Sequence, residues 1–274
     1  MNKYKLVVSD LDGTLLSHDM ILTEENLYAI KDIKAAGVEF AISSGRTLYE
    51  IPKCIIENES IRYIGYSNGT AVYDKLLKRD IMSSRMSKEV VEAVFAILND
   101  YDHIMSMHYN GYAYFEKSHA TTPVFDKHKI NSYYRQVLLQ THLVDGVKQK
   151  AREAEGVESI VMFFDDDAEL EHCRTRLEAL GTLTVTSSIE HNIEVCSKKA
   201  GKGTALTFIR DLLEIEKEAV IAVGDNMNDT AMFDEAGLAL CTSNGSDEAK
   251  SHADEVICSV GENSAKYVYD NYIK

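Results

Sequence analysis

The chain has 274 residues, of which 45% are hydrophobic and 27% are charged. This balance is typical of a globular protein with one or two domains, and it excludes a disordered or collagen-like chain. Acidic residues outnumber basic residues by 44 to 29, which gives a formal net charge of −15. A surface of that charge repels a polyanion, so nucleic acid is not an expected partner.

The apolar runs are short and the cysteines are scattered. No run approaches the ~20 apolar residues that cross a bilayer, and the apolar stretch after Lys5 ends before Asp10, too early for a signal peptide. The five cysteines include no Cys-x-x-Cys pair, and an odd number does not close a disulfide framework. We expect buried thiols in a cytoplasmic protein that works without a membrane, as a monomer or a small homo-oligomer.

The N-terminal segment predicts a strand, a helix and a second strand. Residues 4–9 and 38–42 are short apolar runs, each followed by polar residues. Between them, Thr23 is a suitable N-cap for a helix, and Gly37 ends it. The residues expected on the buried face of this helix are Leu27, Ile30 and Ile33. The order strand, helix, strand implies a right-handed crossover in a parallel sheet.

The C-terminal third repeats this order of elements. Strands are expected at 219–223, 238–241 and 255–258. A helix that begins near Gly203 has an apolar face formed by Leu206, Ile209, Leu212 and Leu213. Both ends of the chain therefore predict parts of one α/β core, a doubly wound, mainly parallel, Rossmann-like sheet.

The middle of the chain has a different order of elements. Ser87 is a suitable cap for an amphipathic helix, and Asn110-Gly111 predicts a hairpin between strands at 103–109 and 112–116. Further expected elements are a helix near 133–143, a strand at 159–164, a helix that buries Leu170, Cys173, Leu177 and Leu180, and a strand at 183–186. Because helices do not separate all of these strands, we predict an inserted α+β domain at 83–188 and a core formed by 1–82 and 189–274.

Polar side chains follow the apolar strands of the predicted core. Asp10 and Asp12 follow the first strand, Ser44 follows the second, and Asp225, Asn228 and Asp229 follow the strand at 219–223. Lys202 precedes a helix and comes just after a strand-like run at 192–196. Because the carboxyl ends of parallel strands form the ligand crevice of an open sheet, we expect these groups to converge. Clustered carboxylates require a compensating cation, and they suit Mg²⁺.

Four short motifs stand in a fixed order along the chain. They are Asp10-Leu11-Asp12-Gly13-Thr14-Leu15, Ser44-Gly45-Arg46, Lys202 within Gly201-Lys202-Gly203-Thr204-Ala205-Leu206, and Gly224-Asp225-Asn226-Met227-Asn228-Asp229. This set resembles the haloacid dehalogenase (HAD) superfamily of phosphotransferases. The form of the last motif and the length of the insertion resemble the Cof-type branch with a C2B cap domain. The resemblance covers essentially the whole chain and implies a HAD-type phosphatase.

The resemblance implies roles for the reacting groups. Asp10 would attack phosphorus and form an aspartyl-phosphate, and Asp12 would protonate the leaving oxygen and then activate the hydrolytic water. Mg²⁺ would be held by the carboxylates of Asp10 and Asp225 and by the main-chain carbonyl of Asp12. Lys202 would offset the negative charge that gathers when an ionised carboxylate approaches a phosphate.

The resemblance also implies contacts with the substrate phosphate. The residues implied are Ser44, Gly45, Arg46, Lys202 and Asn228. Asp229 would not touch the phosphate and would orient Lys202 or a metal-bound water.

Simpler interpretations of these residues stay open. Asp10 and Asp12 could be a turn pair without function, and Arg46 could extend into solvent. The residues that compete with those assigned are Lys198 and Lys199 for Lys202, and Ser43 for Ser44. Ser67-Asn68-Gly69 is either a plain turn or a segment whose Asn68 faces the crevice.

These observations predict a Mg²⁺-dependent phosphatase that acts on a small phosphorylated metabolite, with a sugar phosphate as the first choice. The inserted domain at 83–188 would close over the crevice and admit compact substrates. Two alternatives stay open. A phosphomutase of the same fold would return an isomeric phosphoester, and a non-catalytic regulator would accept phosphate or bind a metabolite without turnover.

Overall fold

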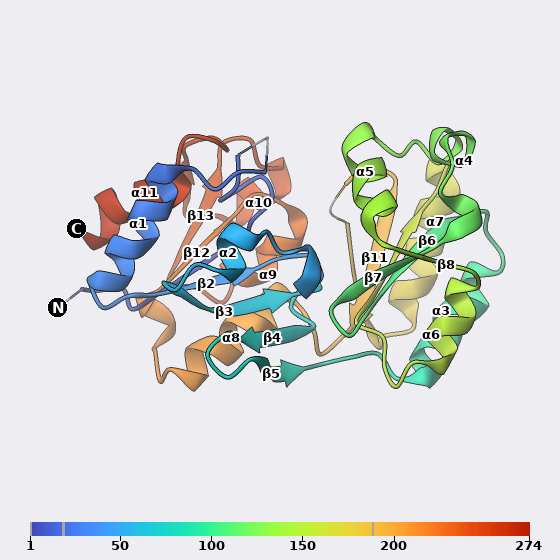
Figure 1. The fold of residues 1–274 in the computed structure, drawn as a ribbon, viewed down its shortest axis with the longest axis horizontal. Coiled ribbons are helices and arrows are strands. Elements are labelled where there is room, and N and C mark those ends of the chain that lie inside the picture. Colours follow the sequence, from blue (N-terminus) through green and yellow to red (C-terminus); the bar gives the residue numbers. More distant parts are fainter. Residues whose placement is uncertain (1, 18–19, 188) are drawn as a thin grey trace. The chain divides into compact units, whose positions relative to one another are not determined.

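The computed structural model describes residues 2–17, 20–187 and 189–274, which form two compact units (Figure 1). The core unit consists of Met1–Arg46, Ile51–Ser83 and Gly201–Lys274. The insertion unit consists of Thr47–Glu50 and Ser84–Ala200. Each unit contains its own sheet and its own hydrophobic core.

The core unit is built on an eight-stranded sheet with the order β14-β13-β12-β1-β2-β3-β4-β5. Its strands are β1 (Leu6–Ser9), β2 (Glu39–Ser43), β3 (Ile61–Tyr66), β4 (Ala71–Asp74), β5 (Arg79–Ser83), β12 (Val220–Gly224), β13 (Leu238–Thr242) and β14 (Glu255–Ile257). The strands from β14 to β3 pair in parallel, and β4 and β5 extend the sheet antiparallel at one edge. The central strands are continuous apolar runs because a parallel sheet is covered on both faces.

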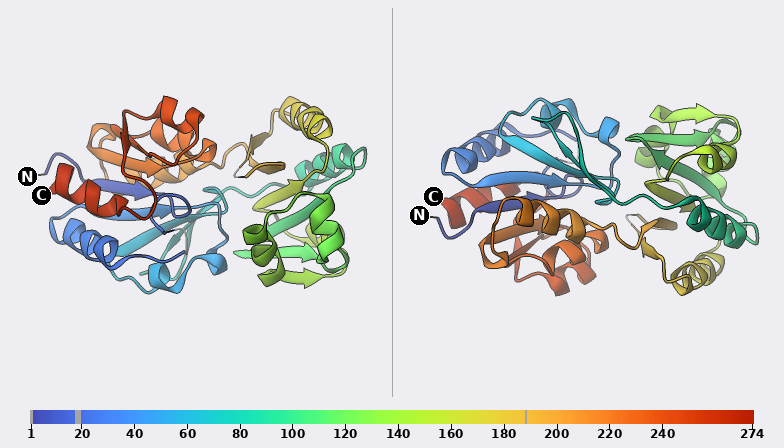
Figure 2. Two further views of the ribbon diagram at one scale, coloured as in Figure 1. Left: turned by 90° about the horizontal axis from the view of Figure 1, so that it is seen from above. Right: turned by 90° about the horizontal axis from the view of Figure 1, so that it is seen from below.

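Helices cover both faces of this sheet (Figure 2). They are α1 (Glu24–Ala35), α2 (Lys53–Ile56), α8 (Lys202–Leu212), α9 (Thr230–Phe233), α10 (Asp247–His252) and α11 (Ser264–Val268). Val8 and Ala41 pack with side chains of α8 and α9 in one apolar cluster. Phe40 and Ile42 alternate with Ala41 along β2 and are also buried, so they point to the opposite face, where α1 packs against β2 and α11.

The insertion unit contains a six-stranded sheet with the order β10-β11-β9-β6-β7-β8. Its strands are β6 (Ile104–Tyr109), β7 (Tyr112–Glu116), β8 (His142–Val144), β9 (Ser159–Phe163), β10 (Leu183–Thr186) and β11 (Asn192–Ser197). Its helices are α3 (Lys88–Leu98), α4 (Thr122–Lys127), α5 (Ser132–Gln140), α6 (Val147–Glu153) and α7 (Asp167–Ala179). Side chains of α3, α6 and α7 share one apolar cluster with the sheet, and side chains of α4 and α5 share another. The predicted α/β class, a mainly parallel sheet with an inserted α+β part, is confirmed.

Two local signals act as predicted. The backbone of Asn110 has φ 52° and that of Gly111 has φ 76°, and Tyr109 pairs with Tyr112 across this two-residue turn. Positive φ at both central positions is the geometry of a type I′ hairpin, which Asn-Gly favours. At the start of α1, the amide of Asn26 donates to the Thr23 hydroxyl at 3.2 Å, so Thr23 is the N-cap.

The strand expected at 192–196 was predicted to belong to the core, but it belongs to the insertion unit. β11 pairs antiparallel with β9 and β10 in the insertion sheet, so the insertion unit continues to Ala200 and does not end at 188. Residue 188 itself lies outside the described residues. An apolar run indicates a strand but carries no information about its pairing partners, which are set by contacts distant in sequence.

Two helix faces are narrower than predicted. Leu27 is 41% exposed and Leu212 is 50% exposed, so both lie at the margin of their helices. The members of the same faces that are buried are Ile30, Ile33, Leu206 and Ile209. The helix expected near 133–143 ends at Gln140, and the residues after it form the edge strand β8.

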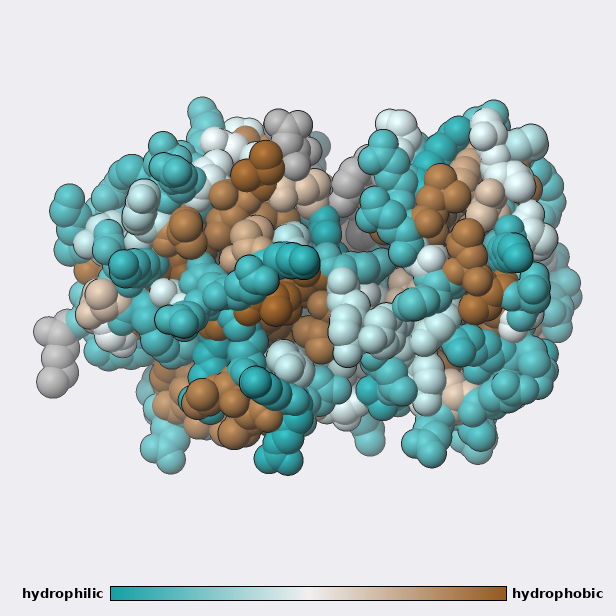
Figure 3. Space-filling model, in the orientation of Figure 1, coloured by the Kyte–Doolittle hydropathy of each residue, from teal (hydrophilic) through white to brown (hydrophobic). Residues whose placement is uncertain are grey.

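The described surface is mostly polar. Figure 3 shows hydrophilic residues over most of the visible face, with hydrophobic residues in smaller groups. The most exposed large hydrophobic side chains are Leu76, Tyr49, Tyr28 and Ile21. Among the residues that the structure describes, no helix is long and apolar enough to cross a membrane.

Candidate active site

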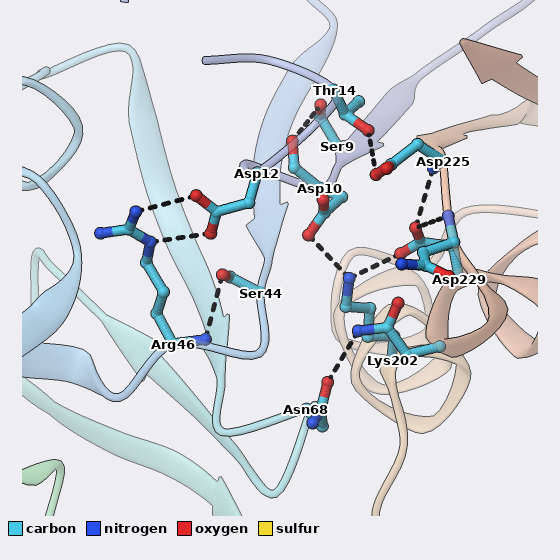
Figure 4. A network of polar contacts seen from close by, with 12 residues as sticks. Ser9, Asp10, Asp12, Thr14, Ser44, Arg46, Asn68, Lys202, Asp225 and Asp229 are labelled. Atoms are coloured by element: carbon cyan, nitrogen blue, oxygen red, sulfur yellow. Dashed lines mark hydrogen bonds and ion pairs between the residues drawn. The ribbon is translucent and has the colours of Figure 1, made fainter. Parts of the chain in front are cut away.

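Polar side chains gather at the carboxyl edge of the core sheet (Figure 4). β2, β1 and β12 are neighbours in this sheet and run in parallel, so their carboxyl ends lie side by side. Asp10 follows β1, Ser44 follows β2, and Asp225 follows β12. Lys202 is the first residue of α8, and Asp229 ends the short 3-10 helix Met227–Asp229. The topology therefore brings together groups that lie 192 residues apart in the case of Asp10 and Lys202.

Lys202 forms two buried ion pairs. Its Nζ donates to Asp10 Oδ1 at 2.6 Å and to Asp229 Oδ1 at 2.6 Å. Lys202 is 2% exposed and Asp229 is fully buried. Burial opposes the charge on Lys202, but Asp10 and Asp229 outweigh it and raise the pKa of the ammonium group. Lys202 is therefore charged and held in one position by two carboxylates.

Asp229 acts as a support for this arrangement. Its Oδ2 accepts hydrogen bonds from the amide of Asp225 at 2.9 Å and from the amide of Asn226 at 3.0 Å, while its Oδ1 accepts from Lys202. Both carboxylate oxygens are thus used within the protein. A buried carboxylate with three donors fixes the loop after β12 and the Lys202 side chain together.

Asp10, Asp225 and Asp229 form a group that could hold a metal ion, since one ligand atom from each lies within 4.8 Å of the others. Burial raises the pKa of Asp10 well above its ordinary value, with Lys202 opposing and Asp229 and Asp225 adding to the shift. Burial and the charge of Asp229 raise the pKa of Asp225 to about 6. One lysine does not compensate three clustered carboxylates, of which Asp10 and Asp229 are buried. Oxygen ligands suit Mg²⁺, so these residues fit a hard divalent cation.

Gly13 allows Asp225 to approach the loop after β1. The backbone of Gly13 has φ +84°, and a Cβ at this position would lie 2.3 Å from Asp225 Oδ2. The next residue, Thr14, donates from its hydroxyl to Asp225 Oδ1 at 2.9 Å. The loop after β1 therefore orients Asp225 by contact and by hydrogen bond.

Asp12 points to a different partner from Asp10. Arg46 donates from Nε to Asp12 Oδ2 at 2.7 Å and from Nη2 to Asp12 Oδ1 at 2.8 Å. The side chain of Asp12 is 38% exposed and that of Arg46 is 19% exposed. This bidentate pair holds the side chains of Asp12 and Arg46 beside the cluster of Asp10, Asp225 and Asp229. From the sequence we expected Arg46 to contact the substrate phosphate or to extend into solvent, so its pair with Asp12 is an additional finding.

A second loop lies against the segment after β2. The amide of Asn68 donates to the Ser44 carbonyl at 3.0 Å, and the amide of Ser67 donates to the Arg46 carbonyl at 2.8 Å. Asn228 Nδ2 donates to Asn68 Oδ1 at 3.0 Å. The Ser44 hydroxyl accepts from the amide of Arg46 at 3.2 Å. Ser44, Asn68 and Asn228 are therefore joined in one polar network.

The structure brings the predicted residues together at one edge. Lys202 joins Asp10 to Asp229, which accepts from the amide of Asp225. A second set of hydrogen bonds runs from Asp12 through Arg46, Ser44 and Asn68 to Asn228. The competing residues are placed differently: Lys198 and Lys199 are exposed, and the Ser43 hydroxyl is buried without a hydrogen-bond partner among the described residues.

Thr14 was assigned no role from the sequence, although it stands inside the first motif and binds Asp225. For Asn68 the sequence left open a plain turn or a side chain that faces the crevice, and the structure has Asn68 accept a hydrogen bond from Asn228. Asn68 follows a parallel strand, as the groups after β1, β2 and β12 do.

Comparisons with known proteins show the family of this chain. The family model of the haloacid dehalogenase-like hydrolases matches residues 7–268. A curated relative from Bacillus subtilis (strain 168), 5-amino-6-(5-phospho-D-ribitylamino)uracil phosphatase YwtE, is 28% identical over 289 residues, which cover 98% of this chain and 98% of the relative.

Two solved structures are similar over almost their whole length. A haloacid dehalogenase-like hydrolase from B. subtilis has a TM-score of 0.85 and 26% identity, and the match covers 97% of this chain and 99% of that chain. The HAD subclass IIB sugar phosphatase BT4131 has a TM-score of 0.82 with 98% of both chains covered, but its 19% identity supports only a common fold. The family match includes all four motifs and confirms the resemblance seen in them. This chain is a hydrolase and belongs to the haloacid dehalogenase-like hydrolase family.

Proposed function

We propose that this hydrolase is a Mg²⁺-dependent phosphatase that cleaves a small phosphorylated metabolite, a sugar or polyol phosphate, through an aspartyl-phosphate on Asp10. The observation that carries the proposal is the buried ion pair of Asp10 with Lys202, at 2.6 Å, next to Asp225 and Asp229. A nucleophilic carboxylate beside a fixed cation is what attack on an anionic phosphate requires. The name of the B. subtilis relative, a phosphatase of a phosphorylated ribityl compound, supports a polyol phosphate as the substrate class.

The proposed reaction has two steps. A carboxylate oxygen of Asp10 attacks phosphorus, the bond from phosphorus to the ester oxygen breaks, and Asp12 gives a proton to the departing alcohol. Water then attacks the aspartyl-phosphate, Asp12 takes its proton, and inorganic phosphate leaves with Asp10 restored. Lys202 stabilises the charge on the phosphoryl oxygens in both steps, and Asp229 keeps it oriented.

The carboxylates of Asp10 and Asp225 and the main-chain carbonyl of Asp12 would hold Mg²⁺. When bound, the ion supplies positive charge that lowers the repulsion between the carboxylates and the phosphate. Ser44, the Gly45 backbone and Asn228 would contact the phosphoryl oxygens. Arg46 would exchange Asp12 for the substrate phosphate, which frees Asp12 to carry the proton of the leaving group.

A release assay for inorganic phosphate tests this proposal. Sugar phosphates, polyol phosphates, nucleotides, flavin mononucleotide and pyridoxal phosphate are offered with Mg²⁺, and then with excess chelator. We expect release from a sugar or polyol phosphate, loss of release in chelator, and no release by Asp10→Asn. Turnover without metal contradicts the metal requirement. An isomeric phosphoester as the product indicates the mutase, and absence of any turnover indicates the regulator.

A further inference from the structure

The loop after β1 is held through its carbonyl groups by side chains from other elements of the core unit. The Leu15 carbonyl accepts a hydrogen bond from Asn26 Nδ2 at 2.9 Å, and the Thr14 carbonyl accepts one from Ser264 Oγ at 2.9 Å. Asn26 lies in α1, and Ser264 begins α11, 250 residues along the chain from Thr14. Because Asn26 and Ser264 are both 2% exposed, these bonds lie inside the protein and not in solvent.

The carbonyl of Gly13, the residue before Thr14, is held in the same way from the end of β13. It accepts from Asn244 Nδ2 at 2.9 Å and from Thr242 Oγ1 at 3.2 Å. Thr242 is fully buried and Asn244 is exposed. Three successive carbonyls of one loop are thus bonded by side chains. The four side chains that donate to them, which we name the carbonyl donors, are Asn26, Thr242, Asn244 and Ser264.

Asn26 is itself fixed by the elements around it. Its main-chain amide donates to Thr23 Oγ1 at the start of α1, and its Oδ1 accepts from the amide of Ala265 in α11 at 3.0 Å. Its Nδ2 donates to Leu15. Because both ends of this buried side-chain amide have partners, its orientation is determined. The side chain therefore joins the loop after β1 to α1 and α11, two helices that pack against each other.

The backbone of this loop requires such support. Gly13 has φ +84°, and the amides of Leu15 and Leu16 both donate to the Leu11 carbonyl at 3.0 and 2.9 Å. A glycine loses more conformational freedom on folding than any other residue, so holding it in one conformation costs free energy. Hydrogen bonds from the carbonyl donors to successive residues of the loop offset this cost. They favour one conformation of the loop over its alternatives.

The conformation of this loop determines where Asp225 lies. Thr14 Oγ1 donates to Asp225 Oδ1 at 2.9 Å, and the Gly13 backbone lies next to the same carboxylate (Figure 4). The residue before Gly13 is Asp12, whose main-chain carbonyl is a Mg²⁺ ligand in the proposed function. A shift of the loop would therefore displace two of the proposed metal ligands together. Partners that orient metal ligands in this way have large effects on metal affinity.

We propose that Asn26 and Ser264 are positioning residues of the candidate active site. They fix the loop after β1, and Thr14 in that loop keeps Asp225 in its place. The Thr14 carbonyl is bonded by Ser264 and the Thr14 hydroxyl bonds Asp225, so the effect of Ser264 passes to Asp225 through Thr14. The other two carbonyl donors support the same loop. This inference rests on the proposed function, in which Asp225 holds Mg²⁺.

Four variants of the full chain test this inference. Ser264→Ala removes the hydroxyl that donates to the Thr14 carbonyl, and Thr14→Val removes the hydroxyl that donates to Asp225 with little change of shape. The third variant combines these two substitutions. Ser251→Ala is the control, because Ser251 Oγ donates to the Glu248 carbonyl at 2.7 Å within α10 of the same unit. The control therefore also loses one hydrogen bond from a serine to a carbonyl.

Calorimetric titration with Mg²⁺ alone measures metal binding without turnover. Thr14→Val should raise the Kd about tenfold, and Ser264→Ala, which acts one residue further away, about fivefold. Ser251→Ala should leave the Kd unchanged. Because Ser264 acts through Thr14, the double variant should bind Mg²⁺ no more weakly than Thr14→Val. An unchanged Kd in Ser264→Ala overturns the inference, since a merely structural hydrogen bond would lower stability alone, and so do additive losses in the double variant.

Hydrogen exchange of the metal-free protein tests the loop itself. The amides of Leu15 and Leu16 should exchange several-fold faster in Ser264→Ala than in the wild type, because local opening of the loop becomes easier. Ser251→Ala should leave their exchange unchanged. Equal exchange in the wild type and in Ser264→Ala would overturn the inference.

The same experiments distinguish failure of this inference from failure of the proposed function. A wild type that does not bind Mg²⁺ overturns the metal requirement of the proposed function. A wild type that binds Mg²⁺, together with an unchanged Kd in Ser264→Ala, overturns only the inference.

Discussion

Gly13 and Gly37 both have positive φ, at +84° and +79°, but only Gly13 faces a neighbour at close range. An added Cβ on Gly37 meets no described atom within 4 Å, whereas on Gly13 it meets Asp225 Oδ2 at 2.3 Å. Gly37→Ala should therefore cost about 1–2 kcal/mol of stability from backbone strain alone. Gly13→Ala should cost at least as much and should also displace Asp225.

Urea unfolding and a Mg²⁺ titration of phosphatase activity distinguish these effects. We expect Gly37→Ala to keep the wild-type activity at saturating Mg²⁺. Gly13→Ala should require more Mg²⁺ for half-maximal activity and should lose roughly tenfold or more in kcat, since misplaced groups in an active site have large effects. Equal Mg²⁺ requirements for the two variants would contradict the role given to the contact with Asp225.

Asp10 and Asp12 are separated by their contacts, and a chemical test can separate their roles. Asp10 is paired with Lys202, and Asp12 is paired with Arg46. Asp12→Asn should lose about 10²–10⁴-fold in turnover, because proton transfer by Asp12 is removed while the Asp10 nucleophile is kept. With an aryl phosphate, whose leaving group needs no proton, the first step should be spared and phosphate should accumulate on Asp10.

A single-turnover quench with radioactive aryl phosphate, followed by peptide mapping, measures this accumulation. Asp10→Asn serves as the control and should carry no label. Label on the Asp10→Asn protein together with none on the Asp12→Asn protein would show that the two roles are reversed.

The sequence predicted which residues lie together in the carboxylate cluster better than it predicted their contact partners. Motif order and strand ends were sufficient to find Asp10, Lys202, Asp225 and Asp229, because topology brings the ends of parallel strands together. The pair of Arg46 with Asp12 and the contact of Asn228 with Asn68, 160 residues away, depend on side-chain directions. Residue types and spacing do not determine such directions, so these contacts could be found only in the structure.

At the scale of elements, the sequence predicted helix caps and turns correctly, but it did not predict which strands pair. Thr23 caps α1 and Asn110-Gly111 forms its hairpin because each depends on neighbouring backbone atoms only. β11 was recognised as a strand but assigned to the core unit, whereas it pairs with β9 and β10. The sequence between β10 and α8 does not mark where the chain leaves one sheet for the other.

His103, in the segment between α3 and β6, should make the stability of the insertion unit fall at acid pH. Burial lowers the pKa of His103 to about 4, although its Nδ1 donates to the Tyr101 carbonyl at 3.0 Å. Between pH 6.5 and pH 4 the unfolded chain binds a proton at this position and the folded chain does not, so stability falls as the pH falls through this window. The shift corresponds to at most about 3 kcal/mol.

Urea unfolding at pH 7 and pH 4.5, followed by circular dichroism, measures this loss. His103→Gln should reduce the difference between the two pH values, because the titrating group is gone. His142→Gln is the control, since His142 is exposed on the edge strand β8 and should leave the difference unchanged. The same loss in the wild type and in His103→Gln would assign the acid sensitivity to other groups.

At the scale of the whole molecule, each of the two units has hydrophobic clusters of its own among the described residues. One cluster lies between the insertion sheet and α3, α6 and α7, and another lies between the core sheet and α8 and α9. A chain whose two units have separate hydrophobic clusters is not expected to unfold in one two-state transition. A ligand that binds one unit should therefore raise the Tm of that unit alone. The three carboxylates that fit Mg²⁺, those of Asp10, Asp225 and Asp229, all belong to the core unit.

Mg²⁺ should accordingly stabilise one unit and leave the other unchanged. Binding that is specific to the folded state adds about 2.7 kcal/mol at a ligand concentration of 100 Kd. The proposed Mg²⁺ would do so by compensating Asp10 and Asp225. Differential scanning calorimetry with and without Mg²⁺ should show a higher Tm for the core transition only. Asp225→Asn should lose most of that shift because one carboxylate ligand is removed. An equal shift of both transitions, or an undiminished shift in Asp225→Asn, would mean that the ion binds elsewhere.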